Sequence, residues 1–292
     1  MKGTMPRIDE VWSHMGGCKI FSALDLPEGF FQFGLREADR PKTAFTDQDG
    51  AQWQWLVCPF GLKNMPHWCQ AHMNKVAGIA RERMKAAGVE GYIVVWMDDV
   101  LVASEDESSH QAALKILFQV SQEQQVRYKL DLTKLARSEV IWCGFRVSAQ
   151  GRKVAASRAD LQTWATPTTR SQIQQLTGWA QWSAQDHPRL HFLLQPFFVA
   201  LAGSGPIPDL AQPMLELKQA LGQEDDWLAF PQMGRRFDVF TDASLTGVGA
   251  SVFQDGHAVA HIPRLSRCVS GAGLSGTGNC MLSSGAFGNF AG

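Results

Sequence analysis

Two adjacent acidic residues, Asp98 and Asp99, are the first candidates for chemistry in this sequence. They follow the apolar, β-branched run 92–97 and precede a second such run, 100–102. This pattern predicts a strand, a tight turn and a second strand, with both carboxylates at the turn. Adjacent carboxylates repel each other unless cations or solvent screen them. The pair therefore indicates either a cation site or a solvated surface turn.

A third carboxylate, Asp25, ends another strand-like run, 19–25, just before a predicted turn at 27–29. Taken alone, such a residue is more often a helix cap or a turn former than a ligand. Together, Asp25, Asp98 and Asp99 place carboxylates at the ends of separate strands. That arrangement suits two Mg²⁺ ions held about 3.5–4 Å apart for in-line displacement at phosphorus.

The segment 59–66 could form a binding loop. Gly61 and Asn64 permit unusual backbone angles, and Pro66 suits the first turn of a helix that continues through Gln70. The alternative is a plain strand-to-helix loop, and this segment taken by itself favours that alternative.

Composition limits the classes of protein that these residues can serve. The chain has 292 residues, of which 45% are hydrophobic, enough for about two domains with a substantial core. Its net charge of −1 excludes a globally basic nucleic-acid binder but not a local basic face. The six cysteines form no C-x-x-C pair, which argues against a zinc site or a disulfide framework. We find no signal peptide or membrane-spanning run and expect an intracellular protein, cytoplasmic or nuclear.

The elements that must position the candidate residues divide the chain into four zones. These are strand-like and helical runs in 1–147, helices and a linker in 148–213, a new β pattern within 214–263, and a Gly- and Ser-rich tail in 264–292. In the second zone, Thr169 and Gln172 fit a capping box at the start of a helix. We expect the tail to be disordered, because it lacks any periodicity that could bury a face.

Five ordered motifs carry a resemblance to a known family. The chain resembles the reverse transcriptases of gypsy-type LTR retrotransposons and their retroviral and pararetroviral relatives in FSALDLPEGFFQ, PKTAF, CPFGLKNMP, VVWMDDVLVAS and WCGFRVSAQG. A later segment is similar to the opening strand pair of the adjoining RNase H domain, in TDASLTGVGASVFQDG. The resemblance implies an α+β fold. Its expected parts are a polymerase palm, an antiparallel sheet flanked by helices, in 1–147; a thumb-like helical connection in 148–213; and a partial RNase H-like β element in 214–263.

The resemblance implies a catalytic role for the three carboxylates. Asp25, Asp98 and Asp99 would hold two Mg²⁺ ions, or Mn²⁺ in their place, for RNA-directed DNA polymerisation. The implied partners are an RNA or DNA template with its primer and deoxynucleoside triphosphates. Phe30 matches the aromatic residue that crowds the incoming sugar and so selects deoxynucleotides. The resemblance also implies that the protein comes from a retroelement, a kind of element associated with DNA integration. A retroelement particle is one expected location of the protein.

Further residues match family positions that contact nucleotide or primer–template. Lys134 falls near the lysine that protonates the leaving pyrophosphate, and the segment 142–145 matches the hairpin that grips the primer end. The full set implied in such binding is Gly61, Asn64, Gln70, Met97, Lys134, Trp142 and Gly144.

The sequence also departs from the family pattern. We expect the basic fingers segment that precedes the first catalytic aspartate to be truncated, and Trp96 replaces the usual Tyr or Phe before Met-Asp-Asp. Asp242 matches the first RNase H metal ligand, but no glutamate follows Glu224 and Asp255 is the only acid after Asp242. We therefore expect an incomplete RNase H site without ribonuclease activity.

Two hypotheses stay open. The first is a nucleotidyltransferase fragment of a retroelement Pol polyprotein. The second is a catalytically inactive relic or a nucleic-acid-binding remnant. The sequence sets neither the natural template nor the oligomeric state.

Overall fold

The described part of the chain in this computed structural model comprises residues 11–155, 162–183, 190–221, 227–243 and 247–265. Its first elements are β1 (Ile20–Asp25), the 3-10 helices η1 (Gly29–Gln32) and η2 (Glu37–Thr43), β2 (Phe45–Thr46), β3 (Gln52–Trp53), α2 (Met65–Ala86), β4 (Tyr92–Trp96), β5 (Asp99–Ser104), α3 (Glu107–Glu123), β6 (Lys134–Arg137), β7 (Glu139–Trp142), β8 (Phe145–Ser148) and β9 (Gly151–Val154). The later elements are α5 (Arg170–Ser183), α6 (Leu190–Leu193), α7 (Gln195–Ala202), α8 (Ala211–Leu221), β10 (Asp238–Ala243), β11 (Gly247–Gln254) and β12 (His257–Leu265).

The central sheet is antiparallel, with strand order β4-β5-β1-β6. Strands β4 and β5 are joined by a tight turn, which confirms the strand, turn and strand predicted around Asp98. Side chains alternate across the sheet, as the two-residue period of a strand requires. In β1, Leu24 belongs to the core on one side of the sheet and Phe21 to the core on the other. The sheet is therefore buried on both faces near its carboxylates.

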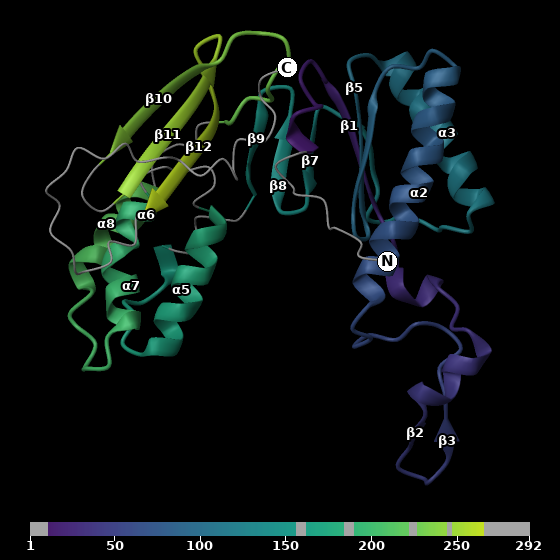
Figure 1. Cartoon of the computed structure of the whole chain (residues 1–292), viewed down its shortest axis with the longest axis horizontal. Helices are drawn as coiled ribbons and strands as arrows, with labels where there is room; N and C mark the ends of the chain where they lie inside the picture. The colour runs from purple at the N-terminus through teal and green to yellow at the C-terminus, as the bar shows by residue number, and fades with distance from the viewer. Residues whose placement is uncertain (1–10, 156–161, 184–189, 222–226, 244–246, 266–292) are drawn as a thin grey trace, which may run out of the picture.

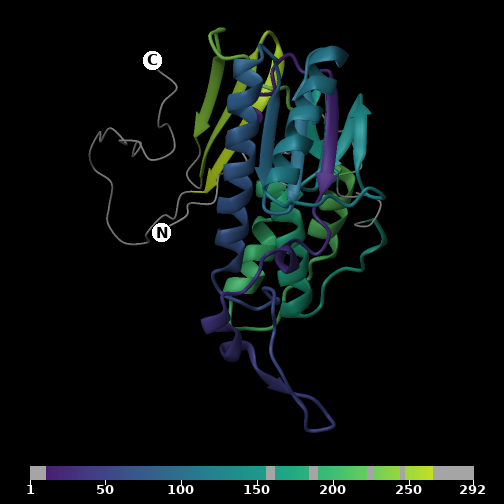
Figure 2. The same cartoon turned by 90° about the vertical axis from the view of Figure 1, so that its right-hand side faces the viewer.

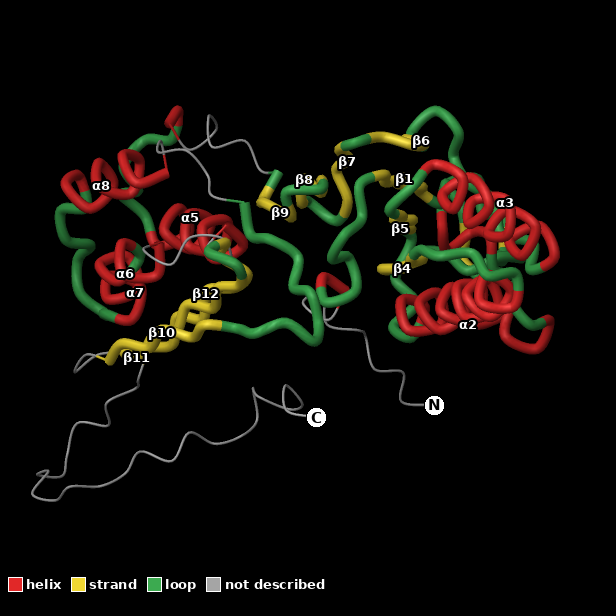
Figure 3. The backbone as a smooth tube through the Cα atoms, turned by 90° about the horizontal axis from the view of Figure 1, so that it is seen from above, coloured by secondary structure: helices red, strands yellow, loops and turns green. Residues whose placement is uncertain are grey.

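Helices α2 and α3 lie side by side against one face of this sheet (Figures 1 and 3). Met73 of α2 and Leu117 of α3 are fully buried and pack with Val100 of β5. Helix α3 begins at residue 107 because the Asp106 side chain accepts a hydrogen bond from the Ser109 N–H, which caps the helix. The two helices thus fix one side of the sheet as a rigid layer.

The opposite face of the central sheet is covered by a second antiparallel sheet, β7-β8-β9. Its core contains Trp12, which meets Trp142 edge-on at a ring-centroid distance of 5.6 Å and Phe145 at 5.4 Å. Strand β9 also forms an antiparallel bridge from Arg152 to Leu228. This small sheet therefore runs across the expected domain boundary at residue 147, because β9 lies beyond it.

The later part of the described chain forms a helical group and a third sheet. Helices α5 to α8 pack around a core that includes Ile173 and Phe197. The capping box predicted at the start of α5 is confirmed, since Thr169 N–H donates to Gln172 Oε1 at 3.1 Å and Gln172 N–H donates to Thr169 Oγ1 at 3.3 Å. Strands β10, β11 and β12 form an antiparallel sheet beside these helices (Figure 1). The predicted tail lies outside the described residues from 266 onward.

The hairpin β2–β3 extends away from the central sheet (Figure 2). Each of its strands has two residues, and its paired aromatic residues Phe45 and Trp53 are 48% and 57% exposed. Antiparallel sheets flanked by helices confirm the expected α+β fold class. Among the helices that the structure describes, none combines the length and apolar character needed to cross a membrane.

Candidate catalytic site

The antiparallel pairing of β1 with β5 brings the three candidate carboxylates together. Asp25, the last residue of β1, lies opposite Asp99, the first residue of β5. The backbone N–H of Leu26 donates to the Asp98 carbonyl at 3.1 Å, which ties the end of β1 to the β4–β5 turn. Strand register therefore places side by side acidic residues that are far apart in the sequence.

Burial and mutual repulsion act on these carboxyl groups. The pKa of Asp25 is raised chiefly by burial and next by the charge of Asp98, while the charge of Lys129 lowers it. The pKa of Asp99 is also raised chiefly by burial, then by Asp98 and, to a smaller extent, by Asp25. The three charges are therefore coupled, and a cation between them would relieve the repulsion.

The carboxylates provide the oxygen ligands that Mg²⁺ and Mn²⁺ prefer. Within the described residues, no group of three or more His, Cys, Asp and Glu side chains is already drawn together as a metal site. Asp25 and Asp99 nevertheless occupy paired backbone positions, and Asp98 occupies the adjoining turn. Their oxygen atoms suit a hard divalent cation, and their assignment as its ligands stays a prediction.

The turn between β4 and β5 is held by Gln70 of α2. Its Oε1 accepts from the Met97 N–H at 2.7 Å, and its Nε2 donates to the Val95 carbonyl at 3.1 Å and to Asn74 Oδ1 at 2.9 Å. The Gln70 side chain is 3% exposed and its amide is engaged by the protein. The place near nucleotide and template implied for this part of α2 stays a prediction. Met97 is half-buried in the turn, and its implied contact stays a prediction.

Two contacts around the carboxylates were missed by sequence reasoning. The Cys143 thiol donates to Asp99 Oδ2 at 3.5 Å. Burial, together with the negative charge of Asp99, raises the pKa of that thiol. A Cβ at Gly29 would lie 3.3 Å from the Asp98 Cβ, so the chain passes closely behind the turn. Both residues lie within the quoted motifs, but only tertiary packing shows which atoms they meet.

A lysine other than the predicted one lies beside Asp25. Lys134 is exposed in β6, opposite Ala23 of β1. The backbone N–H of Lys129 donates to the Asp25 carbonyl at 2.9 Å, and the charge of Lys129 lowers the pKa of the Asp25 carboxyl. The structure thus favours Lys129 over Lys134 as the cation near the carboxylates, and no spacing signal distinguished the two.

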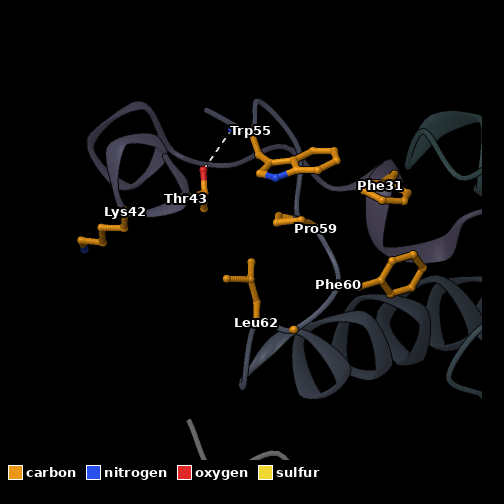
Figure 4. Close-up of a pocket in the computed structure, with 8 residues that line it drawn as sticks. Phe31, Lys42, Thr43, Trp55, Pro59, Phe60 and Leu62 are labelled. Atoms are coloured by element: carbon orange, nitrogen blue, oxygen red, sulfur yellow. Dashed lines mark hydrogen bonds between the residues drawn. The ribbon is translucent and has the colours of Figure 1, made fainter. Parts of the chain in front are cut away.

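An aromatic cluster surrounds Phe30, which lies in η1 and is partly buried. The Phe30 ring lies 5.7 Å from the Phe60 ring, Phe60 lies 5.1 Å from Phe31, and Phe31 stacks on Trp55 at 5.5 Å. The rings of Phe31, Trp55 and Phe60 border an open pocket of about 420 Å³, from which the Lys42 side chain points away (Figure 4). The pocket is lined by Phe31, Lys42, Thr43, Trp55, Pro59, Phe60, Gly61 and Leu62.

Gly61 and Asn64 lie in the loop between this pocket and α2. Gly61 has φ 92°, a left-handed conformation that glycine adopts without strain. Asn64 immediately precedes α2, and its exposed side chain makes no capping hydrogen bond. Both side-chain positions therefore face solvent, and the nucleotide or template contacts implied for them stay predictions.

Trp142 ends β7, and Gly144 lies in the β7–β8 turn. The Trp142 indole is 2% exposed and packs in the core against Trp12. This side chain is enclosed by other residues, and the primer-gripping role implied for its hairpin stays a prediction. Gly144 has φ 78° and shapes the turn together with Cys143, whose φ is 48°.

The segment that resembles RNase H forms the sheet β10-β11-β12. The backbone of Asp242 lies in β10, opposite Gly249 of β11. The Asp242 side chain lies outside the described residues. Its role as a metal ligand stays a prediction.

Comparison with known proteins agrees with the motifs. Residues 2–147 match the family described as reverse transcriptase (RNA-dependent DNA polymerase). The chain is 27% identical over 275 residues to the Retrovirus-related Pol polyprotein from transposon gypsy of Drosophila melanogaster, covering 89% of this chain and 26% of that protein. It is 26% identical over 260 residues to the Transposon Tf2-3 polyprotein of Schizosaccharomyces pombe, covering 86% of this chain and 18% of that protein. The chain thus spans about a quarter or less of these curated relatives.

Solved structures share the fold at low sequence identity. The foamy viral protease-reverse transcriptase in complex with an RNA/DNA hybrid has a TM-score of 0.78 and 20% identity, covering 91% of this chain and 36% of that chain. The same viral protein in complex with double-stranded DNA has a TM-score of 0.72 and 21% identity, covering 85% of this chain and 51% of that chain. This likeness extends the shared architecture beyond the matched residues 2–147.

Proposed function

This chain belongs to the reverse transcriptase (RNA-dependent DNA polymerase) family, and we propose that it carries the catalytic palm of a retroelement Pol polyprotein. The proposed reaction is template-directed transfer of a deoxynucleotide to the 3′-hydroxyl of a primer, with pyrophosphate as the leaving group. The single observation that carries the proposal is the β1–β5 register, which sets Asp25 opposite Asp99 and beside Asp98. The nucleic acids bound to the foamy viral proteins support a template and primer as partners.

Asp25, Asp98 and Asp99 would hold a pair of divalent cations, Mg²⁺ or Mn²⁺. When bound, such a pair neutralises phosphate charge and activates the primer hydroxyl, so the chain needs no side-chain base. The carboxylates project from the ends of β1 and β5, and helices α2 and α3 hold that sheet rigid. Lys129 supplies a positive charge on the Asp25 side of the site.

Phe30 is the proposed sugar-selecting residue. It lies one residue after Gly29, where an added Cβ would be 3.3 Å from the Asp98 Cβ, and its ring contacts Phe60. A ring fixed at this position would leave little room for a 2′-hydroxyl. The proposed product is therefore DNA.

Primer extension by the full chain tests the proposal, with Asp98→Asn as the critical variant. We expect Asp98→Asn to lower extension at least a thousandfold, because one charge is lost from a three-carboxylate site while the side-chain volume is kept. The matched control is Asp131→Asn, which makes the same change at an exposed residue and should leave extension unchanged.

Equal extension by the wild type and Asp98→Asn would refute the catalytic assignment. If neither protein extends a primer, salt-sensitive binding of template that is the same for both would instead support the nucleic-acid-binding remnant.

A further inference from the structure

Gln70 is a buried polar side chain whose hydrogen bonds all lie within the protein. Its Oε1 accepts from Met97 N–H at 2.7 Å, and its Nε2 donates to the Val95 carbonyl at 3.1 Å. The second Nε2 bond, to Asn74 Oδ1 at 2.9 Å one helical turn along α2, fixes which way the amide faces. Burying a side-chain amide costs free energy unless its oxygen and N–H groups form hydrogen bonds. The three bonds meet this requirement in one orientation of the amide.

The turn that Gln70 contacts is strained. Trp96 pairs with Asp99, so Met97 and Asp98 are the two turn residues, and of these only Met97 has a positive φ, of 55°. A two-residue hairpin turn with positive φ at its first position normally has glycine there. A methionine in that conformation is disfavoured by its Cβ. Other contacts must therefore hold Met97 in place.

Two side chains of helix α2 hydrogen-bond to the backbone N–H and the backbone carbonyl of Met97. Gln70 accepts from the Met97 N–H, and the neighbouring Cys69 thiol donates to the Met97 carbonyl at 3.9 Å. The next residue is Asp98, whose carbonyl accepts from the Leu26 N–H at the end of β1. A rotation at Met97 would therefore shift Asp98 relative to β1.

We propose that Gln70 is a positioning residue that holds Met97 in its left-handed conformation and thereby presents Asp98 and Asp99 beside Asp25. The proposal rests on the proposed function, because it assigns the carboxylates as metal ligands. It gives Gln70 a role through the protein backbone in place of direct contact with nucleotide. A purely structural role in the core is the alternative that the experiment must exclude.

The test measures Mn²⁺ binding to the full chain from the electron paramagnetic resonance signal of free Mn²⁺. Gln70→Met keeps the side-chain length and removes all three hydrogen bonds. We expect it to weaken Mn²⁺ binding about tenfold, as the loss of one or two net hydrogen bonds would, while circular dichroism shows a folded chain. The matched control is Gln111→Met on the exposed side of α3, which should bind as the wild type does.

Rescue distinguishes positioning from packing. Adding Met97→Gly to Gln70→Met removes the steric penalty for positive φ, so we expect it to restore at least threefold of the lost affinity. A core-packing defect would not respond to a glycine in the turn. Where Asp98→Asn weakens Mn²⁺ binding, wild-type binding by Gln70→Met, or a loss that Met97→Gly leaves unchanged, would overturn the inference.

Amide hydrogen exchange separates this inference from the proposed function. If the wild type and Asp98→Asn bind Mn²⁺ equally, the metal site itself fails. Faster exchange of the Met97 amide in Gln70→Met than in Gln111→Met would still support the turn-holding role. Unchanged exchange at Met97 would overturn that role whatever the metal result.

Discussion

Lowering the pH should destabilise this chain through His110, which lies fully buried in α3. Its Nε2 lies 2.7 Å from Ser22 Oγ and its Nδ1 lies 3.2 Å from Ser104 Oγ. Ser22 Oγ also accepts from the Ala136 N–H at 2.9 Å, so its hydroxyl proton is free to donate to Nε2 of the neutral ring. A protonated ring would offer a second donor where an acceptor is needed. Burial accordingly lowers the pKa of His110 from its usual 6.5.

The size of this destabilisation follows from the thermodynamic linkage between proton binding and folding. Because the folded-state pKa is lowered, the folded chain prefers the neutral ring, and the stability is present above the unfolded-state pKa and is lost as the pH falls. An unfolded histidine titrates near ~6.5. A folded ring that stayed neutral throughout would set the upper limit, so that His110 removes at most about 1.4 kcal/mol from the free energy of unfolding between about pH 7.5 and about pH 5.5.

Urea unfolding followed by tryptophan fluorescence measures this loss at both pH values. His110→Gln removes the titrating ring, so its free energy of unfolding should fall less than that of the wild type over the same interval, by at most about 1.4 kcal/mol. His67→Gln removes an exposed imidazole of α2 and serves as the control, with the full wild-type loss. An equal loss in the wild type and His110→Gln would refute the reasoning.

Three further changes test the packing around the site. Gly29→Ala should lower the free energy of unfolding, measured in urea, by less than about 1 kcal/mol. It should nevertheless weaken Mn²⁺ binding, because the new Cβ would lie 3.3 Å from the Asp98 Cβ. Unchanged Mn²⁺ binding would contradict this prediction. Gly151→Ala should lower the free energy of unfolding by more than about 4 kcal/mol or prevent folding. The reason is that Gly151 has φ 130° and the new Cβ would overlap the Leu228 carbonyl. A thermal midpoint equal to that of the wild type would contradict this prediction. Trp142→Ala should lower the free energy of unfolding by about 3–5 kcal/mol. Trp142→Phe should lower it much less, because it also removes a buried N–H that has no hydrogen-bond partner among the described residues. Equal losses for the two variants in thermal unfolding would contradict this explanation.

Local sequence patterns were sufficient where the physics is local. The β-branched runs around Asp98 predicted two strands and a turn, and these are β4 and β5. The capping box at Thr169 depends on residues three apart, and it formed as predicted. In each case the interacting groups are close in the sequence, so their types and spacing specify the structure.

The burial of particular side chains could not be predicted in this way. Trp142 was matched to a primer-gripping hairpin, and only the structure shows that its side chain lies between two sheets, where Trp12, far along the chain, packs against it. Gln70 was matched to a helix that packs against nucleotide and template, and only the structure shows that its side chain faces the β4–β5 turn. Which face of an element is covered depends on partners that the local pattern does not contain.

The amino-acid sequence by itself determined the family, since the ordered motifs match a reverse transcriptase, and it predicted the three acidic residues as oxygen ligands. Only the tertiary structure decided which groups stand around those ligands. Strand register set Asp25 opposite Asp99, and chain packing brought Lys129 and Cys143 to the carboxylates. The physical reason is that ligand identity is a property of single residues, whereas charge coupling and hydrogen-bond partners depend on distances that exist only after the strands have paired.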